Sequence, residues 1–359
     1  MKLDRPVKLG VVGLRRGNIA ASVVGDDNVT VRAICDKDPE VLAEKRQGYI
    51  DRGVTDQLCF ADYEEMLASD IDAVYVATDK PLHTKHVIMA LNAGKHVISE
   101  IPTIETFEEA KILRDAVRAH PELKYMAAEN CCYWAFIETW KKMHEDGEFG
   151  DIVYAEAEYL HSTKPEELKP YTTEHWRKYN PAITYITHSL GPLLYIMNDR
   201  CVSVSCVAPD AVYNPYKEGA QNGVALFRTA KGAAIRIFIG FGAYVGFDHN
   251  FALYGTKGMI LTDKTKPLST AHSFARLSSR PDSFEGELME LPLGTSTTGA
   301  TGGHGGADVK MLRDFIRCII EDTDPPLDVD DGIRMSLPGI IANESALRGG
   351  VTLEIPEIL

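Results

Sequence analysis

The sequence has no apolar run that approaches the roughly 18 uncharged residues of a membrane-spanning helix. Its seven cysteines are an odd number and include no Cys-x-x-Cys pair, so neither a disulfide framework nor a structural zinc site is indicated. Positive charge is also scarce, because 38 Lys and Arg face 52 Asp and Glu, which gives a net charge of −14. Such a chain repels nucleic acid and anionic membranes. The expected partners are therefore small molecules or other proteins.

The chain is long and apolar enough for two domains. Its 359 residues are 45% hydrophobic, which is sufficient for two cores of ordinary size. At the N-terminus Asp4, Arg5 and Pro6 precede a short apolar run, as in a first strand rather than in a signal peptide. We therefore expect a cytoplasmic location, and we expect the adjacent Cys131 and Cys132 to be buried thiols.

The first 130 residues alternate between short β-branched runs and helical patterns, which is typical of βαβ units with a parallel sheet. Predicted strands lie at residues 7–12, 29–35, 72–78, 95–99 and 124–129. Between them, residues 62–69 and 106–120 have helical spacing, and Thr106 with Glu109 forms a predicted capping box. These patterns predict a doubly wound α/β domain of the Rossmann type over residues 1–130.

The remaining residues, 131–359, have a different pattern. A predicted helix at 134–145 is followed by alternating strands at 151–161, 222–242 and 250–263, with Lys-Gly hairpin turns at 231–232 and 257–258. Helices at 307–321 and 336–347 are expected to cover this sheet or to pack back on the first domain. We predict an α+β domain with a large, mostly antiparallel sheet, which binds the substrate and forms dimers.

A dinucleotide site is predicted at the start of the chain. The first strand leads into Gly13 and Gly17, and the second ends at Asp36, about twenty residues further on. Glycine lets the backbone approach a pyrophosphate, and the carboxylate accepts hydrogen bonds from ribose hydroxyls while repelling a ribose phosphate, which favours NAD over NADP. The pattern is degenerate, because Arg15 stands where a second glycine is expected. An ordinary strand-to-helix turn is the alternative, and either Arg15 or Arg16 is a further candidate for a phosphate contact.

Three stretches resemble the Gfo/Idh/MocA family of nicotinamide-dependent sugar oxidoreductases. They are Ala77–His83 (ATDKPLH), Gly94–Thr103 (GKHVISEIPT) and Tyr254–Gly258 (YGTKG). In that family the fifth strand ends in Glu-Lys-Pro, and the lysine assists removal of the hydroxyl proton during hydride transfer. Here isoleucine replaces the lysine at position 101, between Glu100 and Pro102. The side chain of Ile101 has no group for that task.

A second departure lies in Ile183–Pro192 (ITYITHSLGP), at the place of the family's Asp-x-x-x-His-x-x-Asp segment. The histidine is kept as His188, whereas Thr184 and Gly191 stand at the aspartate positions. Two polar groups of the ordinary dehydrogenase are therefore absent.

Three further stretches resemble the bacterial NAD-dependent α-N-acetylgalactosaminidases, a redox glycosidase branch that also lacks the lysine. They are Glu129–Tyr133 (ENCCY), Thr187–Pro192 (THSLGP) and Gly302–Asp308 (GGHGGAD). The resemblance implies tightly bound NAD that serves as a transient oxidant. Hydride leaves the third carbon of a sugar, a base removes the acidified proton on the second carbon, the aglycone is eliminated, and water and hydride are then added back. Such a cycle needs two bases and no net electron acceptor.

The predicted catalytic residues of this cycle are Tyr133, His188 and His304. A histidine takes a proton near neutral pH, and a tyrosine does so where a neighbouring cation favours the phenolate. For each residue a structural alternative stays open. Tyr133 is then a core aromatic, His188 a buried histidine satisfied by backbone, and His304, inside a glycine run, part of a flexible loop instead of a substrate-side lid.

The glycine pattern and the resemblance together predict the cofactor-binding residues. These are Gly13, Arg15, Arg16, Gly17, Asn18, Asp36, Thr78, His83, Glu100, Pro102 and Asn130. As weaker predictions, His161 and Arg177 line a sugar pocket and Trp176 stacks on the sugar, although each is as readily structural. His83 and His86 have a spacing that metal-binding histidines use, but no third ligand is in view, so we predict no metal.

The leading hypothesis is an NAD-dependent sugar-active enzyme, either a redox glycosidase or a lyase-like relative. The nearest alternative is an ordinary NAD-dependent sugar or polyol dehydrogenase that uses His188 without the lysine. A second alternative is a catalytically silent dinucleotide-binding sugar sensor. By analogy with the family we expect a homo-oligomer that associates through the open face of the second domain's sheet.

Overall fold

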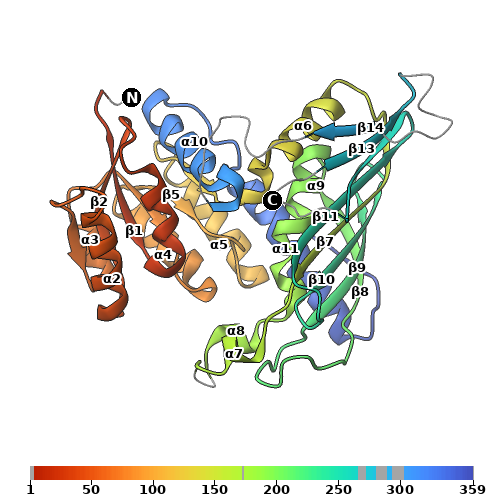
Figure 1. Ribbon diagram of the computed structural model, residues 1–359, viewed down its shortest axis with the longest axis horizontal. Helices are drawn as coiled ribbons and strands as arrows, with labels where there is room; N and C mark the ends of the chain where they lie inside the picture. The colour runs from red at the N-terminus through yellow and green to blue at the C-terminus, as the bar shows by residue number, and fades with distance from the viewer. Residues whose placement is uncertain (1–3, 172–173, 266–271, 280–288, 293–302, 359) are drawn as a thin grey trace. The chain divides into compact units, whose positions relative to one another are not determined.

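The computed structural model (Figure 1) describes residues 4–171, 174–265, 272–279, 289–292 and 303–358. The chain forms two compact units, and each of them contains two segments of the sequence. The first is Met1–Glu129 with Ala300–Ile333, and the second is Asn130–Gly299 with Arg334–Leu359. The predicted boundary at residue 130 assigned residues 300–333 to the second domain, with helices that cover its sheet or pack back on the first domain; these residues are part of the first unit.

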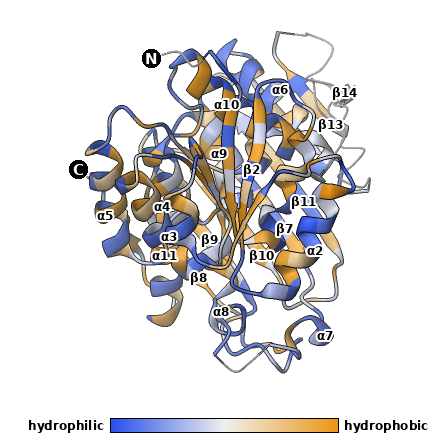
Figure 2. Ribbon diagram, turned by 90° about the vertical axis from the view of Figure 1, so that its left-hand side faces the viewer, coloured by the Kyte–Doolittle hydropathy of each residue, from blue (hydrophilic) through white to orange (hydrophobic). Residues whose placement is uncertain are grey.

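The first unit is built on a six-stranded parallel sheet in the order β3-β2-β1-β4-β5-β6. The strands are β1 (Val7–Val12), β2 (Val29–Cys35), β3 (Leu58–Phe60), β4 (Ala73–Val76), β5 (His96–Ser99) and β6 (Tyr125–Ala127). The inner strands are buried and hydrophobic along their length (Figure 2), as expected for strands covered on both faces. The predicted Rossmann-type fold is confirmed.

The longer helices of this unit are α2 (Pro39–Ile50), α4 (His83–Asn92), α5 (Phe107–Arg118) and α10 (Ala307–Glu321), with the short α3 (Tyr63–Leu67) between them. The predicted capping box is present at the start of α5, where Thr106 Oγ1 accepts the N–H of Glu109 at 3.3 Å. Helix α10 joins this unit because its buried apolar residues, Leu312 and Phe315 among them, pack toward β1 and the turn that follows it.

The segment after β1 differs from the ordinary helix that the dinucleotide pattern leads one to expect. Helix α1 (Leu14–Gly17) is a single turn, and a 3₁₀ segment, η1 (Asn18–Val23), continues it. The sequence NIAASV of η1 contains β-branched residues, Ser and Asn, which are weak helix formers. The α-helix that follows the first strand is therefore only one turn long.

The second unit is built on a nine-stranded sheet in the order β14-β13-β12-β11-β7-β10-β9-β8-β15. The strands are β7 (Ile152–His161), β8 (Cys201–Val207), β9 (Asn222–Thr229), β10 (Ala234–Gly240), β11 (Phe247–Gly255), β12 (Gly258–Thr262), β13 (His272–Leu277), β14 (Met289–Pro292) and β15 (Leu353–Glu354). Among the described strands of this second sheet, only β7 and β10 pair in parallel. The predicted mostly antiparallel sheet is confirmed, as are hairpins at Gly232 and Lys257.

One face of this sheet is covered by helices α6 (Ala135–Glu145), α9 (Thr187–Met197) and α11 (Val329–Leu347), as Figure 1 shows. Two short helices, α7 (Pro165–Leu168) and α8 (Trp176–Tyr179), lie in the loop after β7. The alternation along β7 sends Ala157 and Tyr159 to the covered face, and Glu156 and Glu158 to the open face. Within the described residues no helix is both long and apolar enough to cross a membrane.

Candidate active site

The glycine turn after β1 has the features that a dinucleotide site needs. Gly13 has a φ of 84°, and a Cβ atom there would lie 2.4 Å from the carbonyl oxygen of Ala77 at the end of β4. At Gly17 a Cβ would lie 2.6 Å from the Val11 side chain. Only glycine permits this close approach of the turn to the neighbouring strands. Both glycines are therefore required by the packing itself.

Asp36 lies just beyond β2, beside this turn. Its Oδ2 accepts the N–H of Leu14 at 2.8 Å, and its Oδ1 accepts the N–H of Asp38 at 3.0 Å. The carboxylate is thus held at the carboxyl edge of the sheet, next to the switch in strand order between β1 and β4, where dinucleotides bind in this architecture. The residues present fit a dinucleotide, because the Gly13 turn is tight enough for a pyrophosphate to approach and the Asp36 carboxylate beside it can accept hydrogen bonds from a ribose.

The two arginines of the turn have acidic partners. Arg15 is exposed and forms an ion pair with Asp38 at 3.0 Å, while Arg16 donates to Glu100 at 2.7 Å. Asn18, also exposed, follows at the end of α1. If either arginine bound a phosphate, that phosphate would have to replace the acidic partner of the arginine or share the guanidinium with it.

Arg16 is the centre of a polar chain in the first unit. Besides Glu100 it contacts Asp308 at 3.4 Å, and the hydroxyl of Tyr75 donates to the same Glu100 oxygen that Arg16 binds. Both carboxylates are buried, with at most 6% of either side chain exposed. Burial raises the pKa of Tyr75 well above its usual value, and the charge of Glu100 adds to this effect. Glu100 therefore holds Arg16 and Tyr75, and its neighbour Ile101 is buried.

His304 continues this chain at the start of α10. It has a left-handed backbone conformation with a φ of 52°, and its Nδ1 lies 2.8 Å from Asp308 Oδ2. The part of the glycine run up to and including Gly302 lies outside the described residues. His304 belongs to the first unit, whereas Tyr133 and His188 belong to the second.

Two histidines one turn apart on α4 hold the loops after β4 and β5. The ring of His83 is buried, with Nε2 2.9 Å from the carbonyl oxygen of Thr78 and Nδ1 2.9 Å from that of Pro102. His86 Nδ1 lies 3.0 Å from the hydroxyl of Thr78. Burial, together with the nearby charges of Lys85 and His83, lowers the pKa of His86 to about 4. Both histidines thus bind the loops.

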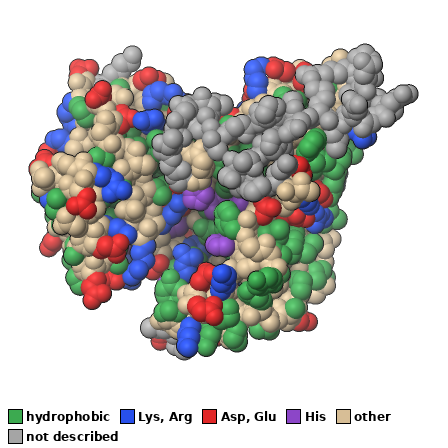
Figure 3. Space-filling view, in the orientation of Figure 1, with side chains coloured by type: hydrophobic (Ala, Val, Ile, Leu, Met, Phe, Trp, Pro, Cys, Tyr) green, Lys and Arg blue, Asp and Glu red, His purple; other side chains and the backbone are tan. Residues whose placement is uncertain are grey.

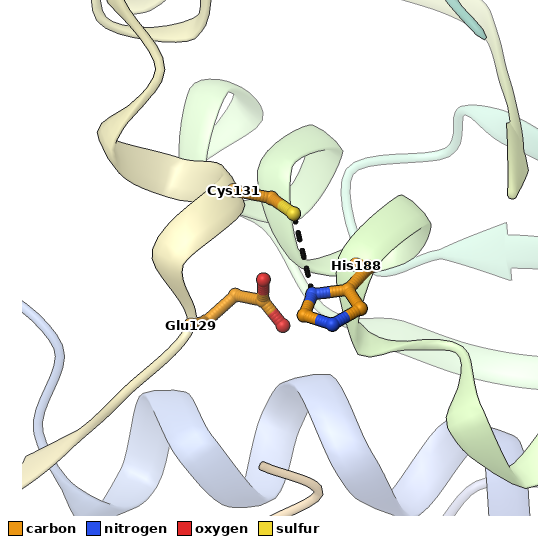
Figure 4. Close-up of side chains that lie close together, drawn as sticks. All are labelled: Glu129, Cys131 and His188. Atoms are coloured by element: carbon orange, nitrogen blue, oxygen red, sulfur yellow. Dashed lines mark hydrogen bonds between the residues drawn. The ribbon is translucent and has the colours of Figure 1, made fainter. Parts of the chain in front are cut away.

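In the second unit, His188 lies in the first turn of α9 and contacts a thiol. Its Nδ1 is 3.2 Å from Sγ of Cys131 (Figure 4), which lies in the 3₁₀ turn η3 (Asn130–Tyr133) two residues after Glu129. Asn130 is fully buried, and Tyr133 is 4% exposed. Cys131 and Cys132 are buried thiols that form no disulfide, as predicted.

A cluster of rings surrounds Tyr159 of β7, and we call it the Tyr159 cluster. Its members are Tyr159, His161, Tyr185, His188, Phe241, Phe247 and His249, and the ring of Tyr159 lies within 6.4 Å of the other six. Tyr159 and His249 are buried, whereas His161, Tyr185 and His188 are partly exposed. Histidine side chains also reach the surface in Figure 3.

The cluster follows from strand register. β7 and β11 pair Tyr159 directly with His249, and the two rings stack at 4.2 Å with an interplanar angle of 16°. Two residues along the same face, His161 Nδ1 lies 3.3 Å from the Tyr159 hydroxyl. Burial lowers the pKa of His161; the charge of Glu167 opposes this shift and that of Arg177 adds to it. A phenol therefore has a neutral imidazole beside it as a proton acceptor.

Tyr159, Tyr185 and His249 are site candidates that were not predicted from the sequence. The period-2 spacing of Tyr159 and His161 on a strand is a signal that was available, as is the three-residue spacing of Tyr185 and His188. His249 has no such signal, because its place depends on the pairing of strands far apart in the sequence.

Two of the weaker sugar-pocket candidates, Trp176 and Arg177, are in contact in helix α8, whereas His161 is the last residue of β7. The guanidinium of Arg177 lies 4.6 Å above the ring of Trp176, and that ring stacks with His175. Arg177 is exposed, and its charge reaches His161. The positive charge of Arg177 thus contributes to the lowered pKa of His161, and its guanidinium covers one face of the Trp176 ring.

Family models match nearly the whole chain. The oxidoreductase-family NAD-binding Rossmann model of Gfo/Idh/MocA matches residues 7–128, and the C-terminal domain model of the same family matches residues 137–261. A glycosyl hydrolase 109 C-terminal domain model matches residues 208–359. Fold, glycine turn and these matches define an NAD-dependent enzyme with a Rossmann domain and a large-sheet second domain.

The chain belongs to the Gfo/Idh/MocA oxidoreductase family and has a C-terminal domain of the glycosyl hydrolase 109 type. It is 27% identical to a glycosyl hydrolase family 109 protein of Solibacter usitatus, over 99% of this chain and 89% of that protein. It is 26% identical to an alpha-N-acetylgalactosaminidase of Bacteroides fragilis, over 98% of this chain and 91% of that protein.

Solved structures share the fold. A levoglucosan dehydrogenase in complex with NADH superposes with a TM-score of 0.84 at 21% identity, covering 99% of this chain and all of that one. A myo-inositol 2-dehydrogenase from Lactobacillus plantarum gives a TM-score of 0.80 at 20% identity, covering 98% of this chain and all of that one. At these identities the likeness concerns the fold alone.

Proposed function

We propose that this protein is a redox glycosidase, or a lyase-like relative, that holds NAD tightly and acts on a sugar or glycoside. The observation that carries the proposal is the Tyr159 cluster, which brings two proton-transfer groups together in a chain that has Ile101 at the place of the dehydrogenase lysine. The glycosyl hydrolase 109 relatives at 26–27% identity support the same reaction class.

The first unit would hold the cofactor. The proposed contacts are the Gly13 turn for the pyrophosphate and Asp36 for the ribose, with Thr78 and Pro102 nearer the nicotinamide. When bound, NAD supplies a reversible hydride acceptor for the third carbon of the sugar. In this proposal the polar chain through Arg16 and Glu100 keeps the loops after β1 and β5 in place.

The second unit would move the protons. His188 takes one proton, either from the sugar hydroxyl that is oxidised or from the adjacent carbon. Tyr159 takes the other while its own hydroxyl proton passes to His161, whose ring is neutral before the transfer and positively charged after it. The same groups return the protons when water adds. This division supplies the two bases that the reaction requires, without a lysine.

The reaction class has a direct test. Purified protein should release NAD on denaturation, and a screen of aryl glycosides with and without added NAD should find turnover that needs no stoichiometric cofactor. Substrate recovered from D2O should carry deuterium at the second carbon. Stoichiometric NADH from a free sugar would instead identify an ordinary dehydrogenase, and cofactor binding without turnover of any sugar would favour the sensor.

The site assignment has a test of its own. Tyr159→Phe and His188→Asn should each lower kcat by about 10²- to 10⁴-fold, the usual effect of removing a general acid or base. Tyr154→Phe is the matched control, because Tyr154 lies on the same strand but on the open face of the sheet. Tyr133→Phe and His304→Asn in the same series test the two other predicted residues. Full activity in both Tyr159→Phe and His188→Asn would contradict the assignment.

A further inference from the structure

A carboxylate, a thiol and an imidazole lie close together, and the proposed reaction uses only the imidazole. The groups belong to Glu129, Cys131 and His188, and their potential ligand atoms all lie within 4.8 Å of one another. Sγ of Cys131 is 3.2 Å from Nδ1 of His188. Figure 4 shows the carboxylate of Glu129 and the thiol of Cys131 both directed toward the imidazole. Carboxylate, thiolate and imidazole are the groups that bind zinc in proteins.

The spacing of these atoms is close to what a tetrahedral zinc ion requires. Zinc lies about 2.3 Å from a thiolate sulfur and about 2.0 Å from an imidazole nitrogen or a carboxylate oxygen, so neighbouring ligand atoms are roughly 3.3 to 3.5 Å apart. The sulfur and the nitrogen already lie 3.2 Å apart. The carboxylate of Glu129, within 4.8 Å of both, needs only a small movement of its side chain. Three protein ligands leave the fourth position for water.

Burial and charge favour a soft divalent cation at this place. Glu129 is fully buried and Cys131 is 2% exposed, whereas His188 is partly exposed and borders the solvent. A carboxylate and a thiolate together carry two negative charges, which neutralise a dication in buried surroundings. Sulfur and imidazole select zinc-like ions, whereas magnesium and calcium prefer oxygen ligands. The ligand set therefore indicates zinc or a cation of similar chemistry.

The prediction of no metal from the sequence was based on the spacing of His83 and His86. The present set has no comparable signal, because His188 lies 57 residues beyond Cys131 along the chain. Its members meet only where the first turn of α9 packs on η3.

We propose that Glu129, Cys131 and His188 form an inhibitory site for zinc or a similar thiophilic divalent cation. On binding, the metal replaces the thiol hydrogen of Cys131, which leaves as a proton. A neutral imidazole has a single nitrogen lone pair, so a metal that takes it leaves His188 unable to accept a proton. The inhibition rests on the proposed function, in which His188 is a base, whereas the metal binding does not.

Cobalt is the probe of binding, because Co²⁺ occupies zinc sites and its spectrum reports sulfur ligation. The full chain, treated with a chelator, is titrated with Co²⁺. We expect a thiolate-to-cobalt charge-transfer band that saturates at one ion per chain and that Zn²⁺ abolishes. Cys131→Ser should abolish the band, and Glu129→Gln should weaken cobalt binding on the order of tenfold. Cys132→Ser and Cys59→Ser are matched controls, which remove the neighbouring buried thiol and the exposed one and should leave the band unchanged.

Inhibition supplies the second readout. Zn²⁺ should lower turnover of a glycoside, and EDTA should restore it. The zinc concentration for half inhibition should rise on the order of tenfold in Cys131→Ser, measured against the uninhibited rate of that variant. Circular dichroism of each variant checks that the fold is kept.

The outcomes separate the metal site from the reaction. Absence of the cobalt band, its survival in Cys131→Ser, or its loss in a control variant overturns the site. Zinc that leaves turnover unchanged or raises it overturns the inhibition. Because the spectra need no turnover, a band that depends on Cys131 in a protein without glycosidase activity would refute the proposed function, and the inhibitory role with it, and leave the metal site standing.

Discussion

At the scale of single residues, two buried carboxylates share one arginine. Glu100 and Asp308 come from distant parts of the sequence and share Arg16, whose side chain is itself only 32% exposed. A buried carboxylate that loses its partner keeps the cost of desolvation without the compensating attraction. The ion pairs therefore matter less for the stability that they add than for the penalty of breaking them.

Arg16→Met should lower the free energy of unfolding by roughly 3 kcal/mol, the low end for breaking a buried pair. Arg16→Lys should recover part of this loss, since a lysine keeps the charge but not the two-armed geometry. Urea denaturation followed by circular dichroism measures the difference. Arg15→Met, which removes an exposed ion pair from the neighbouring position, is the control and should change stability by less than about 1 kcal/mol. Equal effects of the two variants would refute the argument.

A single residue, His86, also makes the stability of the protein depend on pH. Burial lowers the pKa of His86 to about 4 in the folded protein, below the usual value of about 6.5. Between these two pH values the unfolded chain binds a proton that the folded chain does not. The stability contributed by neutral His86 is therefore full above pH 6.5 and is lost as the pH falls toward 4. His86→Gln should show a smaller loss of unfolding free energy between pH 6.5 and 4.5. A parallel decline in variant and wild type would contradict the assignment.

At the scale of elements, the prediction from the sequence succeeded where the signal was local. The capping box of Thr106 and Glu109, five of the six strands of the parallel sheet and the Lys-Gly hairpins are all encoded within a few residues, whereas β3 was not predicted. The 3₁₀ segment after β1 and the Tyr159 cluster were not predicted. The cluster depends on the pairing of β7 with β11, whose partner residues are about ninety positions apart, and no local pattern encodes that register.

The capping box makes a prediction at this scale. Thr106→Ala removes the acceptor for the N–H of Glu109 and should cost about 1 kcal/mol of unfolding free energy. Thr106→Ser keeps the oxygen and should cost much less. Thermal melts of the three proteins give the order of stability. A Ser variant as unstable as the Ala variant would show that the methyl group, not the cap, is responsible.

At the scale of the whole molecule, the open face of the nine-stranded sheet is the surface through which we propose that two copies associate. It exposes Leu226 at 55% and Val224 at 38%, and it also carries both signs of charge, with Arg236 between Glu156 and Glu158. A face that carries both signs and apolar area is able to complement itself across a twofold axis. These features are the reason to expect a second copy of the chain rather than an unrelated partner.

Leu226→Asp should shift the protein toward the monomer, because it places an unpaired charge in an apolar contact. Size-exclusion chromatography with light scattering gives the mass at a series of concentrations. Val212→Asp is the control, since that side chain is 71% exposed in the loop after β8. A wild-type protein that is monomeric at every concentration, or an oligomer that Leu226→Asp leaves intact, would refute this contact.

The composition of the first unit from two separated segments has a consequence for how the protein is made. During synthesis the six parallel strands leave the ribosome early, but helix α10, which packs toward β1, follows only after some 170 residues of the second unit. Until then the apolar surface of β1 and η1 that α10 covers has no helix packed against it. A fragment that stops near residue 130 would lack the same helix, so the NAD-binding unit depends on translation proceeding past residue 321.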